Sequence, residues 1–188
     1  MKKLVLLAGL LASLTASAPA WSQRVKLATS MGDIVLQLDA EKAPKTVANF
    51  VQYVKAGHYN GTIFHRVIDG FMVQGGGMLA DLQEKPTRAP IPLESKNGLS
   101  NVRGSLAMAR TQIPDSATAQ FFINLGDNLR LDAANSPDGN GYAVFGRVID
   151  GMPVVDAIAK VPTGQRGQHG DVPLKPVYIK SVKRKTKS

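Results

Sequence analysis

The sequence predicts a mainly β protein, a closed eight-stranded antiparallel barrel capped by two α-helices. About eight short segments are apolar or alternate apolar and polar residues, as strands do, whereas two short segments carry apolar residues at helical spacing. The 18 glycines and 11 prolines favour many tight turns over long helices. We expect a closed barrel because closure leaves no exposed edge strand.

The segments with strand character are short, and turn residues separate them. The residues from Ser30 to Asp33 supply a turn between the first two, and Asp69-Gly70 joins the third and fourth as a hairpin. In chain order, the predicted strands span residues 25–28, 34–38, 62–68, 71–74, 105–109, 121–125, 142–148 and 177–182.

Two segments have the apolar spacing of helices. Pro44 suits the first turn of a helix, and apolar residues recur at helical spacing from Val47 to Val54 until Gly57 ends the run. Pro153 opens a second short helix with an apolar face. The remaining stretches rich in Gly, Pro or Asn are predicted to be loops: residues 78–92, 126–141 and 162–176.

Composition indicates one ordinary globular domain over residues 24–182, without an internal repeat or a dividing linker. The chain has 188 residues, of which 44% are hydrophobic and 20% are charged, so a disordered chain or a coiled coil is excluded for most of it. Cysteine is absent. That absence excludes disulfides, thiolate zinc sites, iron–sulfur clusters and cysteine nucleophiles.

Residues 1–20 have the three parts of a secretory signal peptide. Basic residues open the chain, an apolar run extends from Leu4 to Leu14, and small residues allow cleavage after Ala20 or after Ser22. The alternative is an uncleaved anchor, but the run is shorter than the roughly 20 apolar residues of a membrane span. We therefore expect an exported protein without a membrane partner, most simply located in a bacterial periplasm.

The chain ends in a basic tail, residues 183–188. The formal net charge is +9, and several of the positive charges lie near this end. A basic tail can bind nucleic acid or anionic lipid, but it is more often a solvated end, which is the interpretation favoured here. Export also removes most nucleic acid from reach, so we expect no nucleic-acid partner.

A search for catalytic motifs returns mostly negative results. The sequence has no His-Glu-x-x-His zinc motif, no Gly-x-Ser-x-Gly nucleophile elbow, no Walker loop and no dinucleotide-binding glycine fingerprint. Its three histidines do not indicate a catalytic triad. We expect neither a metal ion nor a cofactor.

One set of residues suggests a binding cleft. Arg66 lies within an apolar strand, and the strand paired with it places Met72 and Gln74 on one face. A cation, an amide and apolar groups on one sheet face would form a cleft of mixed polarity. From composition alone, a position in the barrel core is the favoured interpretation for Phe71, Met72 and Phe122, and a structural ion pair remains an alternative for Arg66.

The motifs around these residues resemble a known family. Residues 64–76 read FHRVIDGFMVQGG, residues 104–110 read GSLAMAR, and residues 119–124 read AQFFIN. This ordered set resembles the cyclophilin-type peptidyl-prolyl cis-trans isomerases, most closely their bacterial periplasmic branch, over about residues 25–180. The resemblance implies the same eight-stranded barrel with two helices that the strand and helix patterns predict.

The resemblance also implies a role for each site residue. Arg66 falls on the family's catalytic arginine, while His65 is expected to support it. The other residues would form the walls of the proline pocket, bind the substrate backbone or pair with the peptide main chain. These implied substrate-binding residues are Phe71, Met72, Gln74, Ala109, Arg110, Gln120, Phe122, Leu131 and Tyr142.

Three positions depart from the family's common pattern. Tyr142 stands where many members carry His, and Arg110 replaces a common Asn, but its implied role is through the backbone. Arg130 stands where many members place Trp or another aromatic residue that contributes to cyclosporin binding. The resemblance implies that cyclosporin can bind, and Arg130 predicts that it binds weakly.

The expected activity is therefore acceleration of X-Pro rotation. Arg66 would donate a hydrogen bond to the prolyl nitrogen in the twisted state, in which that nitrogen regains its lone pair. The substrates would be proline-containing unfolded or loop segments of exported proteins, and we expect the protein to act as a monomer. The alternative is a proline-peptide binding or chaperone module with little turnover. A basic barrel that binds nucleic acid is disfavoured, because such proteins need exposed aromatic platforms.

Overall fold

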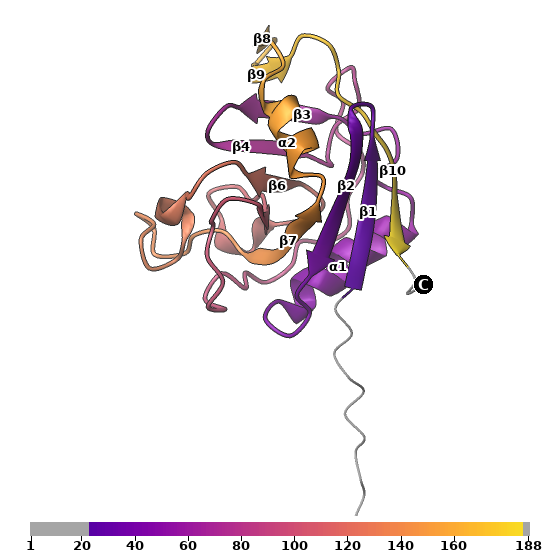
Figure 1. The fold of residues 1–188 in the computed structure, drawn as a ribbon. Helices are drawn as coiled ribbons and strands as arrows, with labels where there is room; N and C mark the ends of the chain where they lie inside the picture. Colours follow the sequence, from indigo (N-terminus) through magenta and orange to yellow (C-terminus); the bar gives the residue numbers. More distant parts are fainter. Residues whose placement is uncertain (1–22, 186–188) are drawn as a thin grey trace, which may run out of the picture.

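The computed structural model describes residues 23–185, so the expected signal peptide and its cleavage positions lie outside the described residues, as do residues 186–188. Eight antiparallel strands form one curled sheet in the order β10-β1-β2-β7-β5-β6-β4-β3 (Figure 1). The strands are β1 (Gln23–Thr29), β2 (Gly32–Leu38), β3 (Phe64–Ile68), β4 (Met72–Gly75), β5 (Ser105–Met108), β6 (Phe121–Asn124), β7 (Val144–Asp150) and β10 (Ile179–Lys185).

The prediction of a closed barrel was wrong, because the sheet is an open, curled half-barrel. Over the described residues, the edge strands β3 and β10 share no ladder and approach each other at a single bridge between Ile63 and Tyr178. Two backbone hydrogen bonds flank this bridge, from Phe64 N to Val177 O and from Ile179 N to Thr62 O. The rest of β3 packs against another hairpin and does not pair with β10.

That hairpin, β8 (Thr163–Arg166) with β9 (His169–Pro173), contradicts the predicted loop at residues 162–176. Its strands are polar and mostly solvent-accessible, so they lack the apolar alternation on which the strand predictions rest. Gly167, with φ +59°, lies in the turn between the two strands. Backbone pairing between β8 and β9 and the contact of β9 with β3 stabilise the hairpin.

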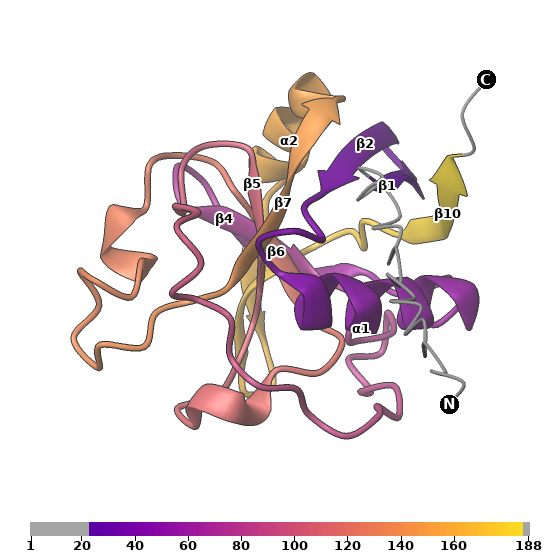
Figure 2. The ribbon, with the colours of Figure 1, turned by 90° about the horizontal axis from the view of Figure 1, so that it is seen from below.

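The two predicted helices are present at opposite ends of the curled sheet (Figure 2). In α1 (Pro44–Lys55), Pro44 occupies the first turn and the apolar face from Val47 to Val54 is buried. In α2 (Met152–Ala159), Pro153 lies in the first turn, and Gly151 precedes the helix with φ +88°. A Cβ at Gly151 would lie 2.3 Å from Asp33 O, so only glycine allows the helix to start this close to β2.

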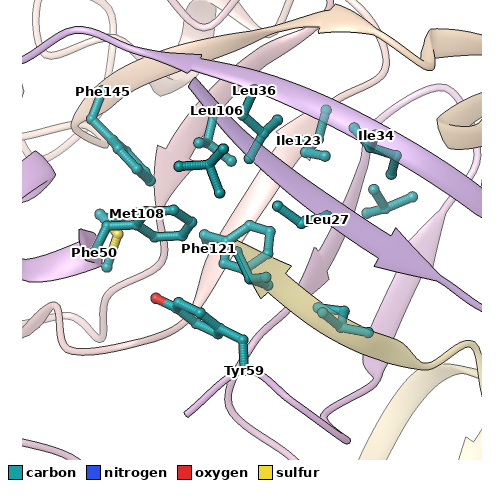
Figure 3. Packing of buried hydrophobic residues seen from close by; sticks show 14 of the residues in the cluster. Leu27, Ile34, Leu36, Phe50, Tyr59, Leu106, Met108, Phe121, Ile123 and Phe145 are labelled. Carbon is teal, nitrogen blue, oxygen red and sulfur yellow. The ribbon is translucent and has the colours of Figure 1, made fainter. Parts of the chain in front are cut away.

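Aromatic side chains form the centre of the core between the sheet and α1 (Figure 3). Phe50 of α1 lies with its ring centroid 5.1 Å from Tyr59, 5.6 Å from Phe121 and 5.2 Å from Phe145. Each of these side chains is fully buried, which stabilises the fold by about 2–3 kcal/mol per phenylalanine. The core therefore fixes β6, which carries Phe121, against the helix.

The last strand is longer than predicted. β10 continues to Lys185, and its residues Lys183, Arg184 and Lys185 pair with β1, so the first half of the expected basic tail belongs to the sheet. Two 3-10 turns complete the described structure, η1 (Pro114–Ser116) and η2 (Leu129–Leu131). Among residues 23–185, no helix has both the length and the apolar character needed to cross a membrane.

Candidate active site

The candidate site lies on the outer face of the sheet, over β3, β4, β6 and β5. Side chains alternate along β6, so Phe121 and Ile123 join the main core whereas Phe122 belongs to a second apolar cluster with Met72. Met72 and Phe122 are 2% and 4% exposed, which is low enough to resemble core residues. The structure therefore decides the alternative left open by composition: both residues lie outside the main core, in the cluster on the outer face.

Arg66 projects from β3 beside this cluster. A register irregularity in the β3–β4 pairing falls at His65, and Arg66 itself pairs with Gln74 across the strands. Its side chain is 46% exposed, and its Nε lies 3.9 Å from the Asp171 carboxylate. Within residues 23–185 the Arg66 guanidinium donates no hydrogen bond, because this ion pair is longer than hydrogen-bond distance. Its N–H donors are thus available to a ligand in the cleft.

The two predicted amide side chains meet next to Arg66. Gln74 Nε2 donates a hydrogen bond to Gln120 Oε1 at 3.0 Å, so each amide keeps further polar atoms for a ligand. The segment that leads to Gln120 is fixed from inside the protein: Tyr59 Oη donates to Ala119 O at 2.9 Å, and Asn49 Nδ2 donates to Thr118 O at 2.6 Å. Buried groups of the core thereby set the position of a site residue.

The apolar wall of the cleft combines two strands and two loops. Met72 and Phe122 form its floor, and Phe71, Leu131 and Tyr142 pack against them. The rings of Phe122 and Tyr142 meet edge to face, with centroids 5.7 Å apart. Such a pocket offers an apolar surface to a ligand.

The Arg110 side chain also has a structural role, in addition to the backbone role that the resemblance implies. The side chain is 4% exposed, and Nε donates to Gly141 O at 2.8 Å. The guanidinium also pairs with Asp138 and lies 4.8 Å from the centroid of the Tyr142 ring. Hydrogen bonds from the Asn140 backbone and from Arg110 hold the pKa of Asp138 well below its usual range. Arg110 is thus locked in place as a support for Tyr142.

Arg130 covers the other aromatic wall. Its guanidinium carbon lies 4.8 Å from the centroid of the Phe71 ring, in cation–π geometry. Arg130 follows Leu129 in the turn η2, the same turn that places Leu131 in the cleft. The position at which the resemblance implies an aromatic residue therefore carries a cation that stacks on an aromatic residue.

His65 lies behind Arg66 and is the main unexpected feature of the site. Its side chain is buried, and within the described residues Nδ1 has no hydrogen-bond partner. Burial, with smaller contributions from His169 and Arg66, lowers the pKa of His65 to about 4. His65 is thus neutral at pH 7 and places no second positive charge behind Arg66.

The cleft has a volume of about 550 Å³ and brings all ten predicted site residues together. Ala109, Gln120 and Tyr142 lie just outside the ends of strands. Ala109 N donates to Gln120 O, and Tyr142 N donates to Leu131 O. The wall formed by the β8–β9 hairpin was not predicted from the sequence, although the glycine turn at Gly167 could have indicated it. The additional lining residues are His65, Met78, Glu84, Gln168, His169, Gly170 and Asp171.

A second cavity lies elsewhere on the sheet. A larger cavity of about 790 Å³ lies over β2 and β7, and none of the predicted site residues lines it. Among residues 23–185, no three His, Asp or Glu side chains gather closely enough to hold a metal ion.

Comparison with known proteins assigns the chain to a family. Residues 24–184 match the family described as cyclophilin type peptidyl-prolyl cis-trans isomerase/CLD. The peptidyl-prolyl cis-trans isomerase cyp18 of Streptomyces antibioticus is 58% identical over 85% of this chain and 96% of its own length. Peptidyl-prolyl cis-trans isomerase A of Dickeya dadantii is 54% identical over 91% of each chain.

Solved structures show the same fold. A cyclophilin type peptidyl-prolyl cis-trans isomerase of Cryptosporidium parvum, crystallised in the presence of the dipeptide Ala-Pro, superimposes with a TM-score of 0.73 and 26% identity. The match covers 88% of this chain and 100% of the other. The sequence, the half-barrel and the cleft agree, and the chain belongs to the cyclophilin-type peptidyl-prolyl cis-trans isomerases, a family of enzymes.

Proposed function

We propose that this enzyme accelerates rotation about X-Pro bonds by a hydrogen bond from Arg66 to the prolyl nitrogen. The observation that supports the proposal is that the Arg66 guanidinium makes no hydrogen bond within residues 23–185 and lies beside the apolar floor of Met72 and Phe122. Rotation about a peptide bond meets a barrier of about 18–20 kcal/mol, because amide resonance is lost in the twisted state. Any catalyst must therefore bind the twisted state more tightly than either planar isomer.

Arg66 meets this requirement through the electronic change at nitrogen. In the planar amide the nitrogen lone pair is delocalised and accepts no hydrogen bond, whereas in the twisted state the lone pair is localised. A guanidinium stays protonated at every physiological pH and offers several rigid donors. Its hydrogen bond forms only as the bond twists, which lowers the barrier without tightening the ground state.

The remaining residues hold the substrate while one side of the bond turns. Met72, Phe122 and the residues packed on them would grip the pyrrolidine ring. Gln74 and Gln120 would bind backbone groups of the residue before proline, with the polar atoms that their mutual hydrogen bond leaves free. The substrates proposed are proline-containing unfolded or loop segments, in keeping with the Ala-Pro dipeptide named for the Cryptosporidium parvum protein.

Arg66→Ala tests the mechanism, with Arg66→Lys as the partner variant. We expect Arg66→Ala to lose at least about 100-fold in kcat, which is the effect of removing a hydrogen bond to a developing charge or lone pair. Peptide affinity should change little, and Arg66→Lys should restore only part of kcat. The measurement is exchange NMR on a short Ala-Pro peptide, together with a binding titration. Full activity of folded Arg66→Ala would refute this mechanism.

We also propose that the enzyme acts on exported proteins. The support is the signal-peptide pattern of residues 1–20. Expression of the full chain in a Gram-negative host, followed by fractionation and N-terminal sequencing, tests this. The expected product begins after Ala20 or Ser22 in the periplasmic fraction, and an intact N-terminus in the cytoplasmic fraction would contradict it.

A further inference from the structure

Asp171 has an unusual backbone conformation at the mouth of the cleft. Among residues 23–185, it is one of two non-glycine residues with positive φ, at +58°, and the other is Leu82. The hairpin β8–β9 packs against β3, which brings Asp171 beside Arg66. Residues held in sparsely populated backbone regions are concentrated at functional sites, where the surrounding structure maintains them. This conformation therefore suggests a functional role for the Asp171 side chain.

The Asp171 carboxylate attracts the Arg66 guanidinium without occupying its donors. Asp171 Oδ2 lies 3.9 Å from Arg66 Nε, and the two side chains are 48% and 46% exposed. This distance is too long for a hydrogen bond but short enough for Coulomb attraction. The interaction favours guanidinium positions near β9 and leaves each N–H free.

Within residues 23–185, the two other arginines that pair with a carboxylate differ in this respect. Arg103 forms a two-point hydrogen bond with Asp156, at 2.9 and 2.8 Å, and donates a third to Leu125 O. Arg110 donates to Gly141 O and to Thr111 O and pairs with Asp138. Both guanidinium groups donate their hydrogen bonds to protein acceptors, as structural arginines do. Arg66 has a carboxylate neighbour and yet keeps its donors.

We propose that Asp171 is a positioning residue that restricts the Arg66 guanidinium to the orientation in which it faces the cleft. The proposal rests on the proposed catalytic role of Arg66. An arginine side chain has many rotamers, and those that point to solvent cannot reach a substrate nitrogen. Restricting them before the substrate twists removes an entropic cost from the transition state. The β8–β9 hairpin is the element that supplies this restriction.

Asp171→Asn isolates the charge from the backbone. Asparagine tolerates positive φ as well as aspartate does, so the hairpin should keep its shape. We expect kcat for an uncharged Ala-Pro peptide to fall about two- to five-fold with KM unchanged, which corresponds to the strength of an exposed ion pair. Asp171→Gly, which also suits positive φ, should show the same loss.

Asp156→Asn is the matched control. It removes the same charge from an ion pair of nearly equal exposure, 44% and 47%, on α2 and away from the cleft. Its kcat should equal that of the unmodified enzyme. A loss of the same size in Asp156→Asn would overturn the proposal, because the effect would then follow net charge rather than position.

A double-mutant cycle separates this proposal from the role of Arg66. If Asp171 acts through Arg66, Asp171→Asn should have no further effect on the residual activity of Arg66→Ala. An equal loss in both backgrounds, or unchanged kcat in Asp171→Asn alone, overturns the positioning role and leaves the role of Arg66 standing. Full activity of Arg66→Ala would overturn the proposed mechanism itself. A readout independent of turnover is the order parameter of Arg66 Nε–Hε, which should fall in Asp171→Asn and remain unchanged in Asp156→Asn.

Discussion

Gly77 lies against the side chain of Gln120, so close that no larger residue fits without moving it. A Cβ on Gly77 would lie 2.4 Å from Gln120 Cγ and 2.7 Å from both Cδ and Nε2. Gly77 has no positive φ, so its importance is steric rather than conformational. The absence of a side chain at residue 77 is what allows Gln120 to reach Gln74 and the cleft.

Gly77→Ala should therefore weaken substrate binding. The added methyl group displaces the Gln120 amide, and the loss of about one hydrogen bond to the peptide corresponds to about a five-fold rise in KM. The variant should fold normally, because the displaced atoms belong to a flexible, partly exposed side chain. Steady-state kinetics on an Ala-Pro peptide measures the effect. In a Gln120→Ala background the same substitution should add nothing, and an additional loss there would show that Gly77 acts otherwise.

His65 should make folding stability depend on pH. Its pKa is lowered to about 4 in the folded protein from the ordinary value of 6.5, chiefly by burial. Between these values the unfolded chain binds a proton that the folded protein does not, so stability rises with pH across this window. The loss on going from pH 7 to pH 4 is about 3 kcal/mol from this residue.

Replacing the imidazole with a ring that cannot titrate should remove this dependence. His65→Phe keeps a buried aromatic ring on β3, and urea unfolding of the variant between pH 7 and pH 4 should show a flatter profile than the unmodified protein. Some dependence remains, because burial also lowers the pKa of His58. Identical profiles for the variant and the unmodified protein would contradict the assigned burial of a neutral His65.

Much of this structure could be predicted from local sequence pattern, because the features concerned are local. The alternation in β1 and β2 and the apolar spacing in α1 reflect which face of each element is buried. The predicted site residues come together because β4, β6 and β5 are neighbours in the sheet, so that Gln74, Phe122 and Ala107 lie in one row across it.

The features that were missed depend on contacts between distant segments. The β8–β9 hairpin is polar, and its place beside β3 has no trace in its own sequence. That hairpin packs against β3, and the sheet is open between β3 and β10, neither of which a single strand could have indicated. Asp171 was missed for the same reason, as it meets Arg66 from 105 positions further along the chain (171 − 66). The side-chain role of Arg110 likewise depends on Asp138 in a distant loop.

Arg130 provides a test of how the cleft selects large ligands. Its guanidinium covers the Phe71 ring at 4.8 Å, where the resemblance implies an aromatic side chain in members that bind cyclosporin well. A hydrated cation is costly to cover with an apolar macrocycle, because its charge must lose water without gaining a partner. Arg130→Trp should therefore raise cyclosporin affinity by at least ten-fold, with Kd measured by isothermal titration.

Activity on a short Ala-Pro peptide should change little in the same variant, because a short peptide is bound by the floor of the cleft and by Arg66, Gln74 and Gln120. Arg130→Leu serves as the control: it removes the charge without adding an aromatic ring. We expect Arg130→Leu to raise cyclosporin affinity less than Arg130→Trp does. Both variants remove the cost of covering a charge, but only Arg130→Trp adds an aromatic ring that contacts the ligand. Unchanged cyclosporin affinity in both variants would show that residue 130 does not limit the binding of the macrocycle.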